Sequence, residues 1–343
     1  MISGHTKLIA HLGYPTTSFK APLIYNPYFE SRGIDAVVVP MGCKAEDYPS
    51  FLHHVFRLSN ILGALVTMPR FDLELFLQIS QDHKARRMWI VPPVALALAK
   101  HPIIDNYDLT SVDQVFCGAA PMGEELSNAV AARLNCEMLQ AFGMTELAPA
   151  SHITPLMAPR AGASGLALPN TQCRIVDAET GADMPPSERG ELWIKGPQVM
   201  LGYLNNEEAT AETITSDGWL KTGDIAIIDS DGYMFIVDRL KELIKYKGFQ
   251  VAPAELEAEL LTHTEIADVA VIGIPDDDAG ELPMAFVVPA PNTGLTLEDV
   301  QSYLEGRLSH YKQVRRMEIV SEIPKSAAGK ILRRILKDGL AGQ

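Results

Sequence analysis

Apolar runs alternate with helically spaced segments along the first 150 residues. Continuous runs of strand length stand at Lys7–Leu12, Asp35–Pro40, Ala64–Pro69, Met88–Pro92, Asp113–Cys117 and Glu137–Ala141. Helical spacing fills the intervals at Pro22–Ser31, Phe51–Leu58, Leu73–His83, Val94–Lys100 and Glu124–Leu134. Continuous apolar strands separated by helices predict a mostly parallel sheet covered on both faces. We therefore expect one doubly wound α/β layer here.

The pattern changes at Pro159–Gly165, whose small residues and proline are typical of a linker. Short strands follow at Gln172–Val176, Gly190–Lys195, Ile225–Asp229 and Tyr233–Val237, which predicts a small all-β subdomain. Beyond Asp238 the pattern is α+β, with helices at Pro253–Leu261, from Thr296 and at Ile331–Leu340, and strands at Val269–Ile274, Met284–Val288 and Arg315–Val320. Asp299 stands three residues after Thr296, which indicates a capping box.

These shifts divide the chain into four expected parts. They are a βαβαβ fragment over residues 1–70, the rest of the α/β domain over 71–160, the β subdomain over 161–238, and a C-terminal α+β domain over 239–343. We call the last part the lid.

Composition and charge narrow the class of protein. With 343 residues, 47% of them hydrophobic and 21% charged, the chain can bury an ample core. A net charge of −14 argues against nonspecific binding to nucleic acid. Neither a long apolar span nor a secretory leader is indicated, so we expect a globular, cytoplasmic protein. The cysteines form no C-x-x-C pair and the histidines no H-E-x-x-H pattern, so no metal cage of protein ligands is predicted.

Five segments carry candidate chemistry in the second half of the chain. They are Gln140–Glu146, Gly190–Gly196 continued to Gly202-Tyr203, Lys221–Asp224, Asp238–Lys245 and Lys325–Lys330. The last ends in a lysine behind a glycine. A mobile ammonium there could neutralise charge that builds up when a carboxylate attacks a phosphate, although such a lysine taken alone is usually a solvated surface residue.

In this order and spacing, the five segments resemble the superfamily of AMP-forming adenylating enzymes, which includes acyl-CoA synthetases, luciferases and peptide-synthetase adenylation domains. The segment Asp238–Pro253 is most similar to the 4-coumarate–CoA ligase and luciferase branch. The resemblance extends from about Phe71 to Leu340. It implies ATP, Mg²⁺ and coenzyme A as cofactors and a small carboxylic acid as substrate.

The resemblance also implies roles for the first segment. Glu146 is expected to hold Mg²⁺, and the Thr145 hydroxyl to meet a phosphate oxygen, because hard cations take oxygen ligands. Phe142 is expected against the adenine, with Gln140 and Gly143 near the nucleotide and Gly118, Ala119, Ala120 and Pro121 as a backbone wall. This sequence has Ala141 where the family usually has glycine. Without the resemblance, the segment could equally be a turn with a solvated acid.

Further roles follow for the later segments. Asp224 could accept both ribose hydroxyls, or be a simple turn acid. Arg239 offers a planar fork to ribose and phosphate oxygens, or forms a surface ion pair. The family places its hinge at Lys241. It assigns Lys245 and Gln250 to the second half-reaction and Lys330 to the first; residues alone would make the former pair part of an amphipathic basic turn.

The N-terminal part departs from this family pattern. The family's Ser/Thr/Gly-rich phosphate loop ending in Pro-Lys is not found in the sequence, so we expect a ligase truncated at its N-terminus. Residues 1–70 resemble the substrate-binding half of shikimate dehydrogenases through Gly13-Tyr14-Pro15, Pro22, Asn26 and Val66–Pro69. Phe19, Ala21 and Phe71 stand where that family has its substrate serines and catalytic lysine, and no G-x-G-x-x-G follows. These observations predict a fusion joined within Val66–Phe71.

Three functions remain open from the sequence. The first is an AMP-forming acid–CoA ligase. The second is a catalytically inactive module that still binds nucleotide or coenzyme A, because the missing phosphate loop removes preorganised donors. The third, a dehydrogenase-like protein, is disfavoured by the replaced lysine. The identity of the acid and the oligomeric state are left open.

Overall fold

The computed structural model describes residues 2–66, 71–291, 293–326 and 329–341. Compactness divides the chain into two units, one of residues 1–85 and 102–111 and the other of residues 86–101 and 112–343. The division into four parts that we expect from the sequence stays a prediction.

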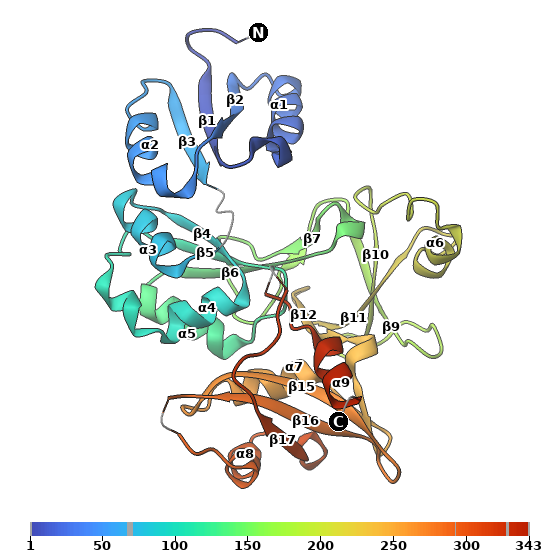
Figure 1. The fold of residues 1–343 in the computed structure, drawn as a ribbon. Coiled ribbons are helices and arrows are strands. Elements are labelled where there is room, and N and C mark those ends of the chain that lie inside the picture. Colours follow the sequence, from blue (N-terminus) through green and yellow to red (C-terminus); the bar gives the residue numbers. More distant parts are fainter. Residues whose placement is uncertain (1, 67–70, 292, 327–328, 342–343) are drawn as a thin grey trace. The chain divides into compact units, whose positions relative to one another are not determined.

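The first unit is built on a parallel sheet with strand order β2-β1-β3 (Figure 1). Its core includes Leu12, Tyr48 and Leu52, all buried. Asn26 ties the first helix to the sheet, since its side chain accepts from Val38 N at 2.8 Å and donates to Val38 O at 3.1 Å. The elements are β1 (Lys7–Gly13), η1 (Thr16–Ser18), α1 (Ala21–Ser31), β2 (Ala36–Gly42), η2 (Ala45–Asp47), α2 (Tyr48–Val55), β3 (Ile61–Val66), α3 (Leu73–Asp82) and η3 (Pro102–Asn106).

The predicted strand Ala64–Pro69 is only partly visible. Its residues Thr67–Pro69 lie outside the described residues, and so does most of the proposed junction Val66–Phe71. The observed strand β3 begins earlier, at Ile61.

The second unit opens with a mixed sheet of strand order β4-β5-β6-β7-β8. Strands β4 (Arg87–Ile90), β5 (Gln114–Cys117) and β6 (Glu137–Gly143) are parallel, and β7 (Ala150–Ile153) and β8 (Leu166–Ala167) continue the sheet antiparallel. Helices α4 (Pro92–Lys100) and α5 (Glu124–Leu134) follow β4 and β5, and η4 (Thr145–Leu147) follows β6.

The prediction of one continuous sheet over the first 150 residues was wrong. Among the described residues, β1 to β3 and β4 to β8 form separate sheets. The repeated strand–helix pattern identified the parallel strands correctly, but it carries no information on which strands are neighbours.

Four antiparallel strands form the next sheet, in the order β12-β11-β10-β9. They confirm the predicted strands, with β11 several residues longer than expected. The elements are β9 (Gln172–Val176), β10 (Gly190–Lys195), α6 (Glu207–Thr213), β11 (Leu220–Ile228) and β12 (Met234–Arg239).

The segment Pro159–Gly165, expected to be a linker, is held in place instead. Ser164 N donates to Met234 O at 2.7 Å, and Met234 N donates to Gly165 O at 2.9 Å. A Cβ on Gly165 would lie 2.0 Å from the carbonyl carbon of Ile153. Gly165, one of the small residues that suggested a linker, is therefore required by close backbone packing.

The C-terminal sheet has the order β14-β13-β16-β15, with β17 parallel to β16. Alternate residues of β15 enter two different cores: Val269 and Val271 pack with α7 and α8, and Ala270 and Ile272 with α9. The predicted capping box at Thr296 and Asp299 is confirmed. The elements are η5 (Leu240–Glu242), β13 (Ile244–Tyr246), β14 (Phe249–Val251), α7 (Pro253–Leu260), β15 (Ile266–Asp276), β16 (Gly280–Pro289), α8 (Leu297–Leu304), η6 (His310–Lys312), β17 (Arg316–Ile319) and α9 (Arg333–Ala341).

No described helix is long and apolar enough to cross a membrane.

Candidate active site

The carboxyl ends of β4, β5 and β6 lie along one edge of their sheet, because the three strands are parallel. The loops that leave this edge begin at Val91, Gly118 and Met144. Ligands of open α/β sheets bind at such an edge. Two of the segments predicted to contact nucleotide, Gly118–Pro121 and Met144–Glu146, therefore emerge side by side.

The loop after β5 turns sharply and is hydrogen-bonded to the neighbouring strand β6. Ala119 has a φ of 72°, a conformation that a residue with a Cβ adopts only at a cost of about 1 kcal/mol. Gln140 is buried on β6, and its side-chain amide donates to Met122 O at 3.1 Å, directly after Pro121. Gln140, predicted to bind the cofactor, thus holds the wall loop in place through its side chain.

The end of β6 is packed tightly against the next strand. Phe142 is half-buried and meets His152 of β7 at a ring-centroid distance of 6.3 Å. A Cβ on Gly143 would lie 2.1 Å from Pro149 O, so only glycine fits there. Their roles toward adenine stay a prediction.

Glu146 is half-buried on η4 and is held by a residue to which we assigned no role. The Tyr203 hydroxyl donates to Glu146 Oε1 at 2.8 Å. Met200 N donates to Glu146 O at 2.8 Å, so the loop before α6 binds both side chain and backbone of this residue. The signal for Tyr203 was its place in the Gly202-Tyr203 motif. Thr145 beside it is exposed.

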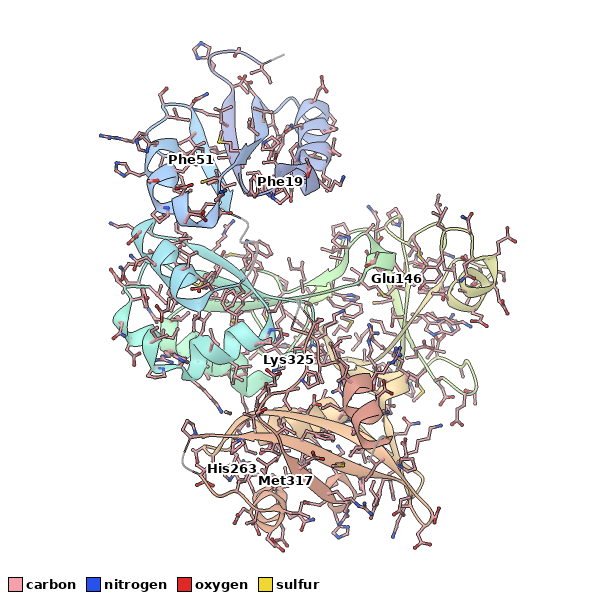
Figure 2. All side chains as sticks on the ribbon, viewed as in Figure 1. Phe19, Phe51, Glu146, His263, Met317 and Lys325 are labelled. Atoms are coloured by element: carbon pink, nitrogen blue, oxygen red, sulfur yellow. The ribbon has the colours of Figure 1, made fainter. Side chains whose placement is uncertain are left out.

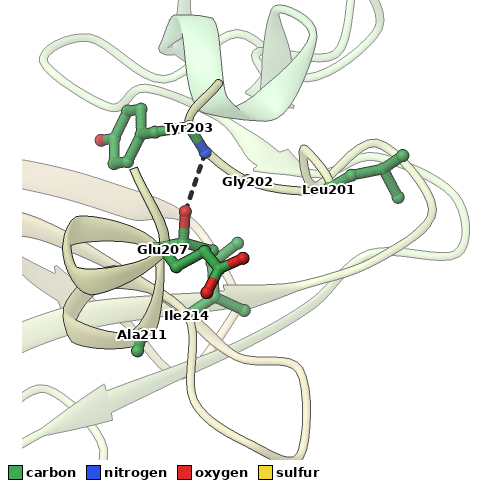
Figure 3. Close-up of a pocket in the computed structure, with 7 residues that line it drawn as sticks. Leu201, Gly202, Tyr203, Glu207, Ala211 and Ile214 are labelled. Atoms are coloured by element: carbon green, nitrogen blue, oxygen red, sulfur yellow. Dashed lines mark hydrogen bonds between the residues drawn. The ribbon is translucent and has the colours of Figure 1, made fainter. Parts of the chain in front are cut away.

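Tyr203 also borders a pocket of about 350 Å³ beside α6 (Figure 3). Two of its lining residues are joined by a hydrogen bond from Tyr203 N to Thr210 Oγ1 of 2.9 Å. None of the residues that we predicted for the site lines this pocket. The lining residues are Leu201, Gly202, Tyr203, Glu207, Thr210, Ala211 and Ile214.

Asp224 and Arg239 face each other across β11 and β12. They are cross-strand partners, and Arg239 Nε lies 3.2 Å from Asp224 Oδ1. Burial raises the pKa of Asp224 to about 6, while the charges of Arg239 and Lys330 act in the opposite direction. The structure therefore brings Asp224 and Arg239 into direct contact, and the charge of Lys330 acts on the same carboxylate.

Asp238, which the sequence offered only as part of a motif, connects this region to the lid. It is buried, and its carboxylate accepts from Arg239 N at 2.6 Å and from Ala254 N at 2.8 Å. Ala254 lies in the first turn of α7, where backbone N–H groups need acceptors. Burial raises the pKa of Asp238, and the hydrogen bond from Ala254 counteracts it.

Lys245 and Gln250 form a second group on the β13–β14 hairpin. They are cross-strand partners and are both exposed. The hairpin turns at Lys247 and Gly248, whose φ values of 48° and 82° are those of a two-residue turn with both residues left-handed. The basic turn expected from residues alone is thus a regular hairpin. Lys241, the predicted hinge, is exposed on η5 just before it.

Lys330 reaches the site from a hairpin that touches the first of the three edge loops. A Cβ on Gly329 would lie 2.9 Å from Pro93 Cγ, at the start of α4, and the φ of Gly329 is 77°. Only glycine therefore allows this approach. Glu146 and Lys325, which opens the hairpin, are both labelled in Figure 2.

The donor set fits a nucleotide and one hard cation. A buried carboxylate with a raised pKa gains stability from hydroxyl donors such as those of ribose. The described residues contain no cluster of three or more His, Cys, Asp or Glu side chains that could hold a metal alone. Mg²⁺ commonly binds through one or two carboxylates together with substrate phosphates, which Glu146 could satisfy.

Comparison with known proteins agrees with this arrangement. The family description "AMP-binding enzyme" matches residues 51–204, and "AMP-binding enzyme C-terminal domain" matches residues 255–330. The chain therefore belongs to the AMP-binding enzymes, the superfamily of AMP-forming adenylating enzymes.

Within that family the chain is similar to 4-coumarate–CoA ligases. It is 46% identical to 4-coumarate–CoA ligase 1 of Solanum tuberosum over 303 residues, covering 84% of this chain and 56% of that protein. It is 42% identical to 4-coumarate–CoA ligase 2 of Nicotiana tabacum over 349 residues, covering 97% of this chain and 62% of that protein. ATP-bound MatB from Rhodopseudomonas palustris superposes with a TM-score of 0.77 at 25% identity, covering 97% of this chain and 60% of that one.

The chain thus spans little more than half the length of these relatives. The Nicotiana tabacum alignment takes in most of residues 1–70. The resemblance of those residues to shikimate dehydrogenases stays a prediction.

Proposed function

We propose that this chain is an AMP-forming acid–CoA ligase acting on a small carboxylic acid. The observation that carries the proposal is the contact of Asp224 with Arg239, two residues of different motifs, together with the charge of Lys330 acting on the same buried carboxylate. The family membership and the exposed Lys245–Gln250 pair support it.

In the first half-reaction, a carboxylate oxygen attacks the α-phosphorus of ATP, the bond to the β-phosphate oxygen breaks, and pyrophosphate leaves. The Asp224 carboxylate accepts hydrogen bonds from the ribose hydroxyls, and Arg239 donates hydrogen bonds that orient ribose and phosphate oxygens. Lys330 stabilises the charge that develops around phosphorus. Glu146, oriented by Tyr203, would hold Mg²⁺, which would add further neutralisation of the phosphates.

In the second half-reaction, the sulfur of coenzyme A attacks the acyl carbonyl carbon, the thiol loses its proton, and AMP leaves. We infer that the lid rotates about Lys241 between the two steps, withdrawing Lys330 and bringing in the face with Lys245 and Gln250. The acidic net charge agrees with a small-molecule substrate and with the absence of a nucleic-acid partner, and a cytoplasmic setting is part of the same proposal.

The test measures the two half-reactions separately. We expect pyrophosphate exchange that depends on one of a panel of carboxylic acids, and its loss in Lys330→Ala. Thioester formation from a supplied acyl-adenylate should persist in this variant but fall in Lys245→Ala. Equal loss of both steps in Lys330→Ala would contradict the assignment.

The competing hypothesis is a protein that binds nucleotide without adenylating. AMP binding without acid-dependent exchange would favour it. Reduction of NADP⁺ by shikimate would instead revive the dehydrogenase hypothesis.

A further inference from the structure

The hairpin that carries Lys330 is closed by hydrogen bonds between its described residues. Ser326 N donates to Lys330 O at 2.9 Å, and Lys330 N donates to the Ser326 hydroxyl at 3.2 Å. Lys325 and Ile331 pair across it as a β-bridge. The backbone position of Lys330 therefore depends on how the base of this hairpin is mounted on the lid.

One side of the base is mounted by Lys325. Its ammonium lies 2.5 Å from Asp268 Oδ2 on β15, and both side chains are largely buried. This contact holds the incoming strand of the hairpin, but a single ammonium–carboxylate contact leaves its rotation unrestricted.

The other side is mounted by Arg333, three residues after Lys330. One of its terminal nitrogens lies 2.7 Å from Glu257 Oε1 and 2.8 Å from Glu257 Oε2. Arg333 Nε also donates to Val271 O at 3.1 Å, and Val271 N donates to Glu257 Oε1 at 2.7 Å. Glu257 of α7, Arg333 of α9 and Val271 of β15 thus form a closed hydrogen-bonded network.

This network crosses the edge of the lid sheet. Strand β15 is the last strand in its order, and α7 and α9 pack on its opposite faces. The N–H and C=O of Val271 that point away from the sheet would otherwise lack hydrogen-bond partners, as is usual at an edge strand. Glu257 and Arg333 satisfy both groups, and in doing so they fix the start of α9 relative to α7.

Stability alone does not explain a buried ion pair here. The side chains of Arg333 and Glu257 are 15% and 9% exposed, and removing two charges from water commonly costs as much as their attraction returns. Helix α9 already buries Leu336 and Leu340 against the sheet. Burial raises the pKa of Glu257 to about 7, and the positive charge of Arg333 acts in the opposite direction by favouring the carboxylate. What a forked donor adds is geometric precision.

We propose that Arg333 and Glu257 are positioning residues for Lys330, which set the rate of acid adenylation by fixing the base of the lysine hairpin. This inference rests on the proposed function for its kinetic consequence. The structural part of the proposal, that the network orders the hairpin, does not depend on the proposed function.

The chain supplies a matched control in the next residue. Arg334 lies on the same helix but its side chain is 92% exposed, and it forms an ion pair with Asp338 at 3.5 Å. We expect Arg333→Met to lower kcat for acid-dependent pyrophosphate exchange 10- to 100-fold, because misplacing a reacting group by about 1 Å has consequences of that order. The KM for ATP should change less than about twofold, and so should the rate of thioester formation from a supplied acyl-adenylate, because neither depends on the position of Lys330 in the first step. Arg334→Met should leave both steps unchanged.

Two further variants separate positioning from folding. Arg333→Lys retains the charge but not the fork, so exchange should still fall. The double variant Arg333→Met with Glu257→Leu replaces the pair by apolar groups and should recover thermal stability without recovering exchange. Recovery of exchange in the double variant, or equal loss in Arg333→Met and Arg334→Met, overturns the proposal.

Amide hydrogen exchange gives a readout that does not need catalysis. The amide hydrogen of Lys330 should exchange faster in Arg333→Met than in the wild type. Its exchange rate should be unchanged in Arg334→Met. If the wild type shows no acid-dependent exchange of pyrophosphate, the proposed function fails while this measurement still decides the mounting of the hairpin. Unaltered amide exchange in Arg333→Met contradicts it.

Discussion

At the residue scale, Asp224 combines burial with two neighbouring cations. Burial favours its neutral form, and Arg239 and Lys330 favour its carboxylate. The balance leaves its pKa at about 6, close enough to neutrality for protonation to be seen in binding experiments.

This balance predicts a pH-dependent affinity for adenosine, a ligand without a phosphate that would titrate in the same range. If only the carboxylate accepts the ribose hydroxyls, the dissociation constant should be constant above pH 6 and rise about tenfold for each pH unit below it. Calorimetric titration from pH 5 to 8 measures this.

The charge of Lys330 gives the matching control. Lys330→Met removes a cation that lowers the pKa of Asp224, so the midpoint of the profile should move to higher pH. Asp224→Asn should bind adenosine weakly at every pH. A midpoint that is the same in Lys330→Met would show that the lysine does not face this carboxylate.

Sequence analysis reached these residues through motifs but missed those that hold them. Asp224, Arg239 and Lys330 belong to short segments with recognisable order. Tyr203 and Asp238 act through hydrogen bonds to Glu146 and to Ala254, residues 57 and 16 positions away. Such contacts depend on tertiary packing, which cannot be predicted from the local periodicity of the sequence.

At the element scale, the β13–β14 hairpin shows why one element went unrecognised. Its strands are three residues each, too short for alternation to be counted, and its turn places Lys247 in a left-handed conformation that lysine rarely adopts. Longer elements with clear periodicity, such as α5 at Glu124–Leu134, were predicted with their observed bounds.

The hairpin predicts an effect confined to one half-reaction. A Cβ on Gly248 meets no atom within 4 Å, so Gly248→Ala acts only through its φ of 82° and should cost about 1 kcal/mol. Since Lys245 and Gln250 sit on this turn, thioester formation should slow more than pyrophosphate exchange.

Gly294→Ala is the control for this substitution. It lies in a lid loop with equally open space and an ordinary φ, so it should alter neither step. A similar slowing of both half-reactions in Gly248→Ala would mean that the hairpin serves the whole lid and has no specific part in thioester formation.

At the scale of the whole molecule, the two compact units predict two unfolding events. All residues assigned to the nucleotide belong to the second unit. AMP at about 100 times its dissociation constant should stabilise that unit by about 2.7 kcal/mol and leave the first unit unaffected. Differential scanning calorimetry should show one transition that moves to higher temperature and one that does not.

Coenzyme A added alone provides the comparison. A ligand that binds the exposed Lys245–Gln250 face should also move only the second transition. A single transition that shifts as a whole with AMP would show that the units unfold together, and no shift at millimolar AMP would argue against nucleotide binding.

The bond between Asp238 and Ala254 has a consequence for timing. Its two residues stand on opposite sides of Lys241, so a turn of the lid about that residue must stretch it. Losing a buried bond to a charged acceptor costs about 1.5–3 kcal/mol, a delay of roughly one to two orders of magnitude if it falls on the slow step. A single carboxylate would then slow the withdrawal of Lys330 and so set the interval between the two half-reactions.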